Sequence, residues 1–420
     1  MSRLLSLSFA CLLSALLGTP AFAAEPSGDW PQFLGPARNG ISAETGLLET
    51  FPAAGLKPAW TAEGGIGMAG VVVSGGKAVT MIEDGSSQLA VALDARTGKM
   101  LWQTAIAPAY KNSMGNGPRA TPAIAGGQIF TLSGEGILTA LSLADGTVSW
   151  SDHCIKRFGG KQAAYGMACS PLVEGGKVIV TVGAPAATVV AYDVKTGKQV
   201  WTAGKEEPAG YSSPAMLNVG GTRQLVVFNG RAAMGINPAD GSLLWRYAYV
   251  TDYDCNIATP LAFKGSIFLS AGENHGATML SLTKTGSTFQ ANPGWESLGP
   301  KSVMRNEWQT SILLDGYLYG FDNVGGAGPI SHLTCIQAGT GTRAWQQVRF
   351  GKGNMIAADG KLFVTTIKGD LVIVKASPAG FKELGRQPVL EMTRQAPALA
   401  GGLLYVRDNN KIVCFDVRKP

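Results

Sequence analysis

The chain has 420 residues, a formal net charge of +6 and 56 glycines, and only 15% of its residues are charged. This charge is too small for general attraction to nucleic acid. The one local basic cluster consists of Lys156, Arg157 and Lys161, and it has no interleaved aromatic residue beyond Phe158. We therefore expect a solvated loop there and no nucleic-acid partner. The glycine content and the near absence of helical periodicity indicate an all-β chain with many tight turns.

Residues 1–23 have the features of a cleaved signal peptide. A short positive start at Arg3 is followed by an apolar run from 4 to 17, and Ala21-Phe22-Ala23 provides a small-x-small cleavage site. The apolar run is too short to cross a bilayer comfortably, and no later segment resembles a transmembrane helix. The sequence therefore predicts an exported protein, periplasmic or secreted.

Residues 24–56 form an N-terminal extension before the first regular strand. Its segment Asp29 to Pro36 is rich in proline, glycine and aromatic residues, which excludes a regular helix. We expect the extension to pack on the surface of the following domain and to bury Trp30 and Phe33. Docking of a partner is the alternative for this segment.

One unit recurs through residues 57–420. Its clearest copies, Ala92 to Trp102 and Ala191 to Trp201, consist of a short apolar strand, an Asp-x-x-Thr-Gly turn and a second strand ending in tryptophan. The Asp can hydrogen-bond its own backbone, and the Gly can adopt the positive φ that such hairpins need. The copies at 282–289 and 374–381 are weaker. A repeat of about 50 residues made of short strands is typical of a propeller or solenoid.

The start and the end of the chain complement each other. A second pair of strands, clearest at Ala168 to Val182, precedes each hairpin, so each unit has four antiparallel strands. The last unit, around Cys414, lacks its fourth strand, and the segment Lys57 to Ala62, which includes Trp60, can supply it. This closure would leave no open sheet edge. The sequence thus predicts an eight-bladed β-propeller, with seven blades as the alternative because two copies are weak.

Five cysteines follow the signal peptide, and their spacing is not that of a metal site. Cys335 and Cys414 fall on the third strands of their blades, where we expect buried thiols. Cys154 and Cys169 flank a loop, and a disulfide between them is one possibility in an oxidising compartment.

The strand directions place the long connections and the starts of the innermost strands on one face of the ring. Loops carry functional sites more often than the scaffold does, so this long-loop face is the candidate surface. Each candidate also has a structural explanation: arginine can bind backbone carbonyls, tyrosines can pack, and asparagines can satisfy turns. Glu273-Asn274-His275 lies on the same side, and no hydrolase, zinc or phosphate-loop motif is present. The candidate binding residues are Arg119, Tyr165, Tyr211, Asn256, Asn306 and Trp308.

The repeated Ala-x-Asp-x-x-Thr-Gly-Lys-x-x-Trp unit resembles the tryptophan-docking motif of the PQQ-like, or quinoprotein-type, β-propellers. The segments Trp30 to Pro36 and Gly210 to Pro214 resemble phrases of exported bacterial members. The resemblance implies that the terminal tryptophans pack between neighbouring blades, namely Trp60, Trp102, Trp150, Trp201, Trp245 and Trp345.

The resemblance is less informative about activity, because this family includes quinone-dependent dehydrogenases and non-catalytic scaffolds. The enzymes hold their quinone over a disulfide between adjacent cysteines with a calcium ion nearby, and no two cysteines are adjacent here. We therefore expect a monomeric, non-catalytic binding or scaffold module of the cell envelope, without metal or cofactor, that takes an envelope protein or a small ligand at its long-loop face. The alternative is a PQQ-dependent alcohol or sugar dehydrogenase that uses PQQ with calcium.

Overall fold

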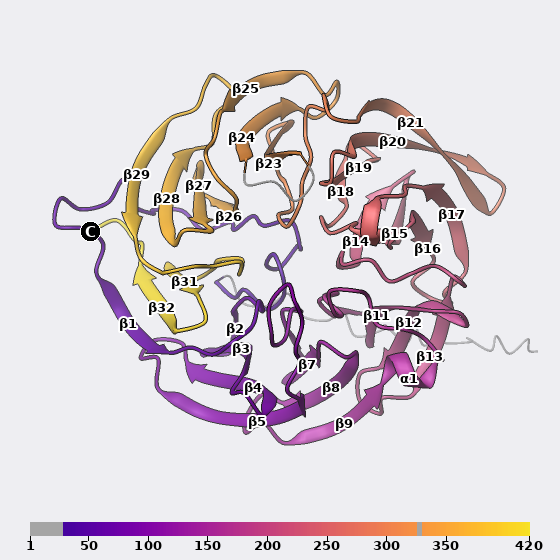
Figure 1. The fold of residues 1–420 in the computed structure, drawn as a ribbon, viewed down its shortest axis with the longest axis horizontal. Coiled ribbons are helices and arrows are strands. Elements are labelled where there is room, and N and C mark those ends of the chain that lie inside the picture. The colour runs from indigo at the N-terminus through magenta and orange to yellow at the C-terminus, as the bar shows by residue number, and fades with distance from the viewer. Residues whose placement is uncertain (1–27, 326–329) are drawn as a thin grey trace, which may run out of the picture.

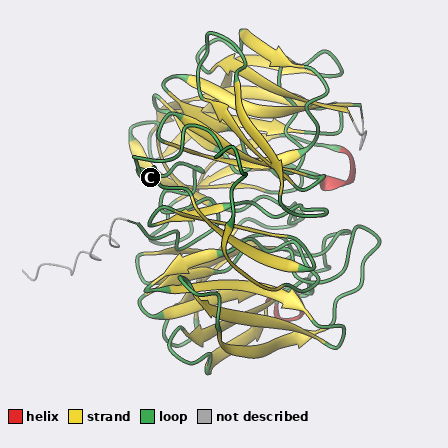
Figure 2. Cartoon of the chain, turned by 90° about the vertical axis from the view of Figure 1, so that its left-hand side faces the viewer, coloured by secondary structure: helices red, strands yellow, loops and turns green. Residues whose placement is uncertain are grey.

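The computed structural model describes residues 28–325 and 330–420, so the signal-peptide prediction lies outside the described residues. The described chain forms eight four-stranded antiparallel sheets. Figure 1 shows these sheets arranged in a closed ring, and Figure 2 shows the ring from the side with loops at both faces. The predicted eight-bladed β-propeller is confirmed, and the seven-bladed alternative is wrong.

Blades one to seven follow one another in the chain, and each has its innermost strand first; blade eight takes its outermost strand from the N-terminal end. The first four blades are β2 (Val72–Ser74), β3 (Lys77–Glu83), β4 (Ser87–Asp94), β5 (Met100–Pro108); β6 (Ala123–Ala125), β7 (Gln128–Leu132), β8 (Ile137–Ser142), β9 (Val148–His153); β10 (Leu172–Glu174), β11 (Lys177–Ala184), β12 (Ala187–Asp193), β13 (Gln199–Ala203); and β14 (Ala215–Val219), β15 (Thr222–Phe228), β16 (Ala232–Ile236), β17 (Leu243–Ala248). The last four are β18 (Leu261–Phe263), β19 (Ser266–Ala271), β20 (Gly276–Thr285), β21 (Thr288–Leu298); β22 (Ile312–Leu314), β23 (Tyr317–Val324), β24 (Ile330–Gln337), β25 (Arg343–Gln347); β26 (Gly353–Ala358), β27 (Lys361–Thr366), β28 (Asp370–Lys375), β29 (Glu383–Pro388); and β30 (Ala398–Ala400), β31 (Leu403–Arg407), β32 (Lys411–Asp416), β1 (Pro58–Glu63). The two short helices are α1 (Cys154–Arg157) and η1 (Asp252–Asp254).

The hairpin turn explains the sequence repeat. In blade one, Oδ1 of Asp94 accepts hydrogen bonds from the backbone N–H groups of Arg96 and Thr97 and from the Thr97 hydroxyl, and Gly98 has a φ of 71°. These hydrogen bonds lower the pKa of Asp94. A register shift then follows, because Leu93 pairs with Met100 whereas Ala92 pairs with Trp102. We call the residue at this shift the docking position of its blade.

The docking tryptophans fix each blade to the next. The indole N–H of Trp102 donates to the carbonyl of Leu143 at 3.3 Å, and that of Trp150 donates to Val194 at 3.0 Å. A Cβ atom on Gly146 would lie 2.5 Å from the Trp102 ring. The turn glycine is therefore needed twice, for its positive φ and for the close approach of the neighbouring indole.

Two blades differ from the predicted pattern. The indole of Trp245 donates to Oε1 of Gln224 in its own blade at 2.7 Å instead of to the next blade. Trp295, which the repeat did not reveal, occupies the docking position of blade five and donates to the carbonyl of Ala338 at 2.9 Å.

Blade seven has glycine at its docking position, and the N-terminal extension fills the gap. Gly385 pairs with Ile373 at the register shift, as the tryptophans do elsewhere. A Cβ atom on Gly385 would lie 3.0 Å from the ring of Phe51, and the Thr50 hydroxyl donates to the carbonyl of Leu384. Phe51 thus takes the place of the missing tryptophan from outside the blade.

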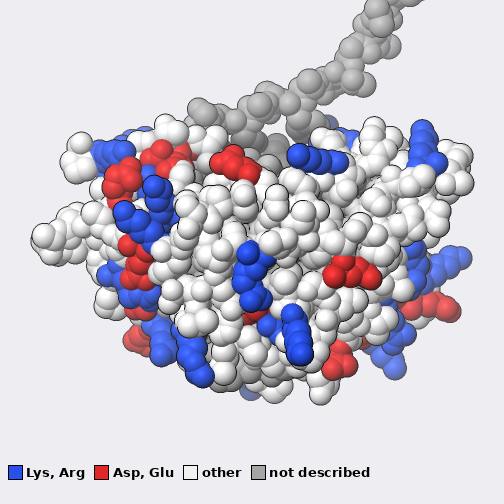
Figure 3. Space-filling view, turned by 90° about the horizontal axis from the view of Figure 1, so that it is seen from above, with Lys and Arg blue, Asp and Glu red and all other residues white. Residues whose placement is uncertain are grey.

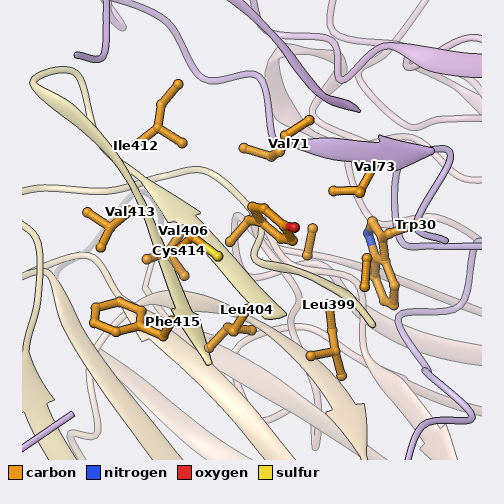
Figure 4. Close-up of a cluster of buried hydrophobic side chains, with 14 of the residues drawn as sticks. Trp30, Val71, Val73, Leu399, Leu404, Val406, Ile412, Val413, Cys414 and Phe415 are labelled. Carbon is orange, nitrogen blue, oxygen red and sulfur yellow. The ribbon is translucent and has the colours of Figure 1, made fainter. Parts of the chain in front are cut away.

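The ring closes between the N-terminal strand and the last blade. Strand β1 pairs with β32, with Trp60 opposite Cys414. Figure 4 shows Val71 and Val73 of blade one facing the side chains of blade eight, with Trp30 at the edge of the same cluster. Arg407, fully buried at this seam, donates to the carbonyls of Ala69 and Met81. The predicted pairing of the chain's beginning with its end is confirmed.

The extension crosses the channel at the face of the short turns, where it can be followed in indigo in Figure 1. Trp30 forms a β-bridge with Val73 of blade one. Arg38 donates to the carbonyls of Ser170 and Pro171 at blade three, and Ile41 then bridges to Ala357 of blade seven. Trp30 is 2% exposed, whereas Phe33 stays half-buried.

The five described cysteines are free and buried, including Cys154 and Cys169, so the possible disulfide between these two is absent. Burial raises the pKa of Cys154 to about 12. Within the described residues, no helix has the length and apolar character needed to span a membrane. On the side seen in Figure 3, lysine and arginine residues are interspersed with acidic ones rather than gathered in one basic patch.

Candidate functional site: a pocket at the mouth of the channel

A pocket of about 260 Å³ opens at the centre of the long-loop face. Every blade but the seventh contributes through the segment that leads into its innermost strand, and blade seven contributes Asn354 from β26 itself. Phe33, from the extension that crosses the opposite end of the channel, also lines it.

The lining has a sequence signature. Most innermost strands are preceded by a proline, as at Pro122 and Pro214, and the residue three positions earlier lines the pocket. We call this residue the mouth position; in the blades without the proline, Ser311, Val71 and Met355 take its place. From blade one to blade eight the mouth residues are Met68, Arg119, Ala168, Tyr211, Ile257, Trp308, Lys352 and Arg394.

Hydroxyl groups just before the prolines hold the mouth in shape. The Thr121 hydroxyl accepts from the backbone N–H of Gly70, and Thr121 N–H in turn donates to the hydroxyl of Ser170 at 2.9 Å. The backbone N–H of Ser170 likewise donates a hydrogen bond to the hydroxyl of Ser213 at 3.0 Å. Because each bond joins neighbouring blades, the mouth residues of blades one to four have fixed relative positions.

Arg119 and two tyrosines form one wall. The guanidinium of Arg119 donates to the carbonyls of Tyr165, Gly115 and Gly117, and it lies 4.5 Å from the centroid of Tyr110. Burial lowers the pKa of Arg119. Of the two roles expected for Arg119, binding of backbone carbonyls is observed, and its side chain also lines the pocket.

The two candidate tyrosines stack on each other. The rings of Tyr165 and Tyr211 lie 5.8 Å apart with an interplanar angle of 27°, and Tyr165 N–H donates to the Tyr211 hydroxyl at 3.2 Å. Burial raises the pKa of both hydroxyls. Both phenols therefore stay neutral at ordinary pH and offer aromatic surface with a hydrogen-bonding edge.

Trp308 forms the opposite wall together with two cations. Lys352 Nζ lies 4.5 Å and the Arg394 guanidinium carbon 4.7 Å from the Trp308 ring centroid. Lys352 also pairs with Glu307 at 2.5 Å, and Arg394 donates to the carbonyl of Met114 at 2.7 Å. Burial raises the pKa of Glu307 and lowers that of Arg394.

Two candidates do not reach the pocket. Asn256 donates to the carbonyls of Asn229 and Tyr249, and Asn306 donates to the carbonyl of Phe321 at 3.1 Å. Both are fully buried, so they satisfy backbone groups, the structural explanation considered for them. His275 packs against Tyr249 with centroids 4.2 Å apart, while Glu273 lines the pocket.

Sequence reasoning missed Arg394, Lys352, Glu307 and Phe33. The signal for Arg394 was present, because Arg394-Gln395-Ala396-Pro397 repeats the arrangement of Arg119-Ala120-Thr121-Pro122, whereas the blade of Lys352 lacks the proline. Glu307 and Phe33 carry no comparable signal, since their places depend on one loop and on the path of the extension.

Comparison with known proteins decides the family. The family model described as "Outer membrane protein assembly factor BamB" matches residues 56–319 and 330–419. The chain belongs to the PQQ-like β-propeller family. No protein with a curated description matches it.

Solved PQQ-like propellers of different activities share this fold. The chain is similar to the quinohemoprotein alcohol dehydrogenase from Comamonas testosteroni, with 16% identity, a TM-score of 0.67, and coverage of 94% of this chain and 82% of that one. It is also similar to BamB from Moraxella catarrhalis, with 11% identity, a TM-score of 0.54, and coverage of 85% and 97%. Identities this low show a common fold and leave the activity open.

The pocket does not match the quinone–calcium chemistry of the dehydrogenase members. Among the described residues, no three His, Cys, Asp or Glu side chains come together as a metal site. Trp308, the aromatic residue best placed to stack a flat quinone, already has two cations over its ring. The residues present thus do not fit PQQ with calcium.

Proposed function

We propose that this protein is an exported, non-catalytic binding module of the cell envelope that holds a ligand or a segment of an envelope protein in the channel-mouth pocket. The observation that carries the proposal is the pocket itself, which is lined mainly by aromatic and aliphatic side chains and built from all eight blades. Pockets of this kind are the usual binding sites of folded proteins.

The polar groups of the pocket support binding rather than chemistry. Glu307 is paired with Lys352, and Arg119 is held by backbone carbonyls, so neither is placed as a free acid, base or nucleophile. Cys255 lines the pocket, but burial raises the pKa of its thiol to about 12, which keeps it from acting as a thiolate.

The proposal is tested by capture from envelope extract and identification of what is bound. Trp308→Ala removes one wall of the pocket and should abolish most of the capture. Leu101→Ala, at an exposed site on the outer strand β5, is the matched control and should behave as wild type. Equal capture by both variants would show that binding, if any, uses another surface.

A PQQ-dependent alcohol or sugar dehydrogenase is the second candidate, because a solved quinohemoprotein alcohol dehydrogenase shares this fold. It predicts that PQQ with calcium raises the melting temperature and that an alcohol or sugar then reduces an artificial dye. Our first proposal predicts neither effect.

A further inference from the structure

We infer that the pocket recognises a compact apolar monocarboxylate, with the carboxylate bound by Arg394 and the apolar body held on the opposite wall. This inference rests on the proposed binding function and names the chemistry of its ligand.

The mouth residues divide the pocket into two halves. Blades three, four and five present Ala168, Tyr211 and Ile257, and the Tyr165 ring stacked on Tyr211 enlarges this apolar half. Blades six and eight present Trp308 and Arg394, and Lys352 of blade seven lies over the Trp308 ring. A ligand that satisfies both halves needs an apolar end and an anionic end.

Arg394 is the cation available to the ligand. Lys352 is neutralised by Glu307 at 2.5 Å, whereas no carboxylate of the described residues forms an ion pair with Arg394. Its guanidinium lies over the Trp308 ring and donates one hydrogen bond to the carbonyl of Met114, which leaves further N–H donors on this half-buried group for a ligand. Burial lowers the pKa of Arg394 without removing its charge, and a planar guanidinium is well suited to hold a carboxylate.

The remaining charges favour one carboxylate over several. Glu273 and Glu307 both line the pocket, and Glu307 already takes up the charge of Lys352. Arg119 is already engaged by three backbone carbonyls. The pocket therefore selects against a tricarboxylate such as PQQ and for a single acid group.

The same chemistry occurs in a free organic acid and in the C-terminal residue of a partner chain. Either ligand would place its carboxylate at Arg394, which lines the pocket. Binding experiments can distinguish these two sources.

The test is calorimetric titration of the full mature protein with matched pairs of probes. N-acetylphenylalanine, phenylpropionate and octanoate are each compared with their neutral amides, and a pentapeptide ending in phenylalanine is compared with its amidated form. We expect the acids to bind at least about tenfold more tightly than the amides, a difference of about 1.4 kcal/mol. Preference confined to the peptide indicates a chain end, and preference confined to the small acids indicates a free ligand.

Variants locate the effect. Arg394→Gln should abolish the preference for acids, Arg394→Lys should keep part of it, and Arg157→Gln should change nothing, since Arg157 also lies over an aromatic ring but outside the pocket. Equal binding of acids and amides, no binding of any acid at about 1 mM, or tighter binding of PQQ than of the monocarboxylates would each overturn the inference. If Arg394→Gln fails to fold, the comparison of acids with amides on the wild-type protein still tests the inference. If the inference fails, capture from envelope extract that depends on Trp308 would still support the broader binding function.

Discussion

Two positions recur in every blade, and this chain fills them by opposite rules. The docking position holds tryptophan in every blade except blade seven, where it holds Gly385 and Phe51 takes the place of the tryptophan. The mouth position holds seven different residue types, and only arginine appears twice. Docking repeats one contact between neighbouring blades, whereas all the mouth residues except Lys352 line a single shared cavity. In this repeat, a position that keeps the same residue type in nearly every blade thus serves packing, whereas a position whose residue type varies marks the candidate binding site.

The largest effect is expected from breaking a docking contact. Trp201 is 6% exposed and donates to the carbonyl of Pro238 in the next blade at 3.2 Å. Trp201→Ala should lower the free energy of unfolding by about 3–5 kcal/mol through lost packing, as measured by urea denaturation. Trp308→Ala, at the mouth, should lower it by much less, and equal losses would remove the distinction between the two positions.

Blade seven offers a smaller, separate test. If Phe51 replaces the missing docking residue, Phe51→Ala should cost about 1–3 kcal/mol, although the residue lies outside the blades. Lys57→Ala, an exposed change nearby, should stay within about 0.5 kcal/mol of wild type. A Phe51→Ala variant as stable as this control would show that blade seven needs no docking residue.

Glu307 gives the mouth a predicted pH dependence. Burial raises its pKa above the ordinary value, so the folded state binds its proton more tightly than the unfolded state does. This contribution to stability is therefore present at low pH and lost as the pH rises from about 4.3 through the folded-state pKa. The stability of Glu307→Gln relative to wild type should improve over this rise when unfolding is followed at pH 4 to 7.

Asp84 is the control of opposite sign, since hydrogen bonds from Ser86 and Ser87 lower its pKa. The stability of Asp84→Asn relative to wild type should decline as the pH rises from the folded-state pKa of Asp84 to about 3.9, its unfolded value. A Glu307→Gln variant whose relative stability also declined would contradict the assigned direction.

The smallest effect concerns thiol chemistry. All five described cysteines are buried, and burial raises the pKa of Cys154, Cys255, Cys335 and Cys414 to about 12. A thiol reagent at pH 8 should label the native protein slowly and label five thiols after denaturation without reductant. A count of three would reveal a disulfide.

The sequence was sufficient for the architecture because the docking unit is local: one turn, one glycine and one tryptophan define it. Trp295 escaped this reasoning because the β20–β21 hairpin is longer than the others and its turn lacks the Asp, although Trp295 lies midway in the sequence between Trp245 and Trp345. Phe51 could not be foreseen, since its contact with Gly385 depends on the path of the extension around the ring.

The site was only partly predictable, for a related reason. Four of the six candidates line the pocket, namely Arg119, Tyr165, Tyr211 and Trp308. The other two, Asn256 and Asn306, lie one and two residues before a mouth position and donate hydrogen bonds to backbone carbonyls instead. Loops of different length lead into the innermost strands, so only the recurring proline marks which side chain faces the channel. Which charges lie beside Trp308 depends on contacts between blades six, seven and eight, which no single repeat encodes.

The central claim is that docking tryptophans hold the ring while mouth residues bind. The most direct measurement determines both the free energy of unfolding and ligand capture for two matched variants, Trp201→Phe and Trp308→Phe. We predict that Trp201→Phe loses stability and keeps capture, and that Trp308→Phe keeps stability and loses capture. If the two variants lose stability and capture in the same proportion, the division of the repeat into a packing position and a binding position is wrong.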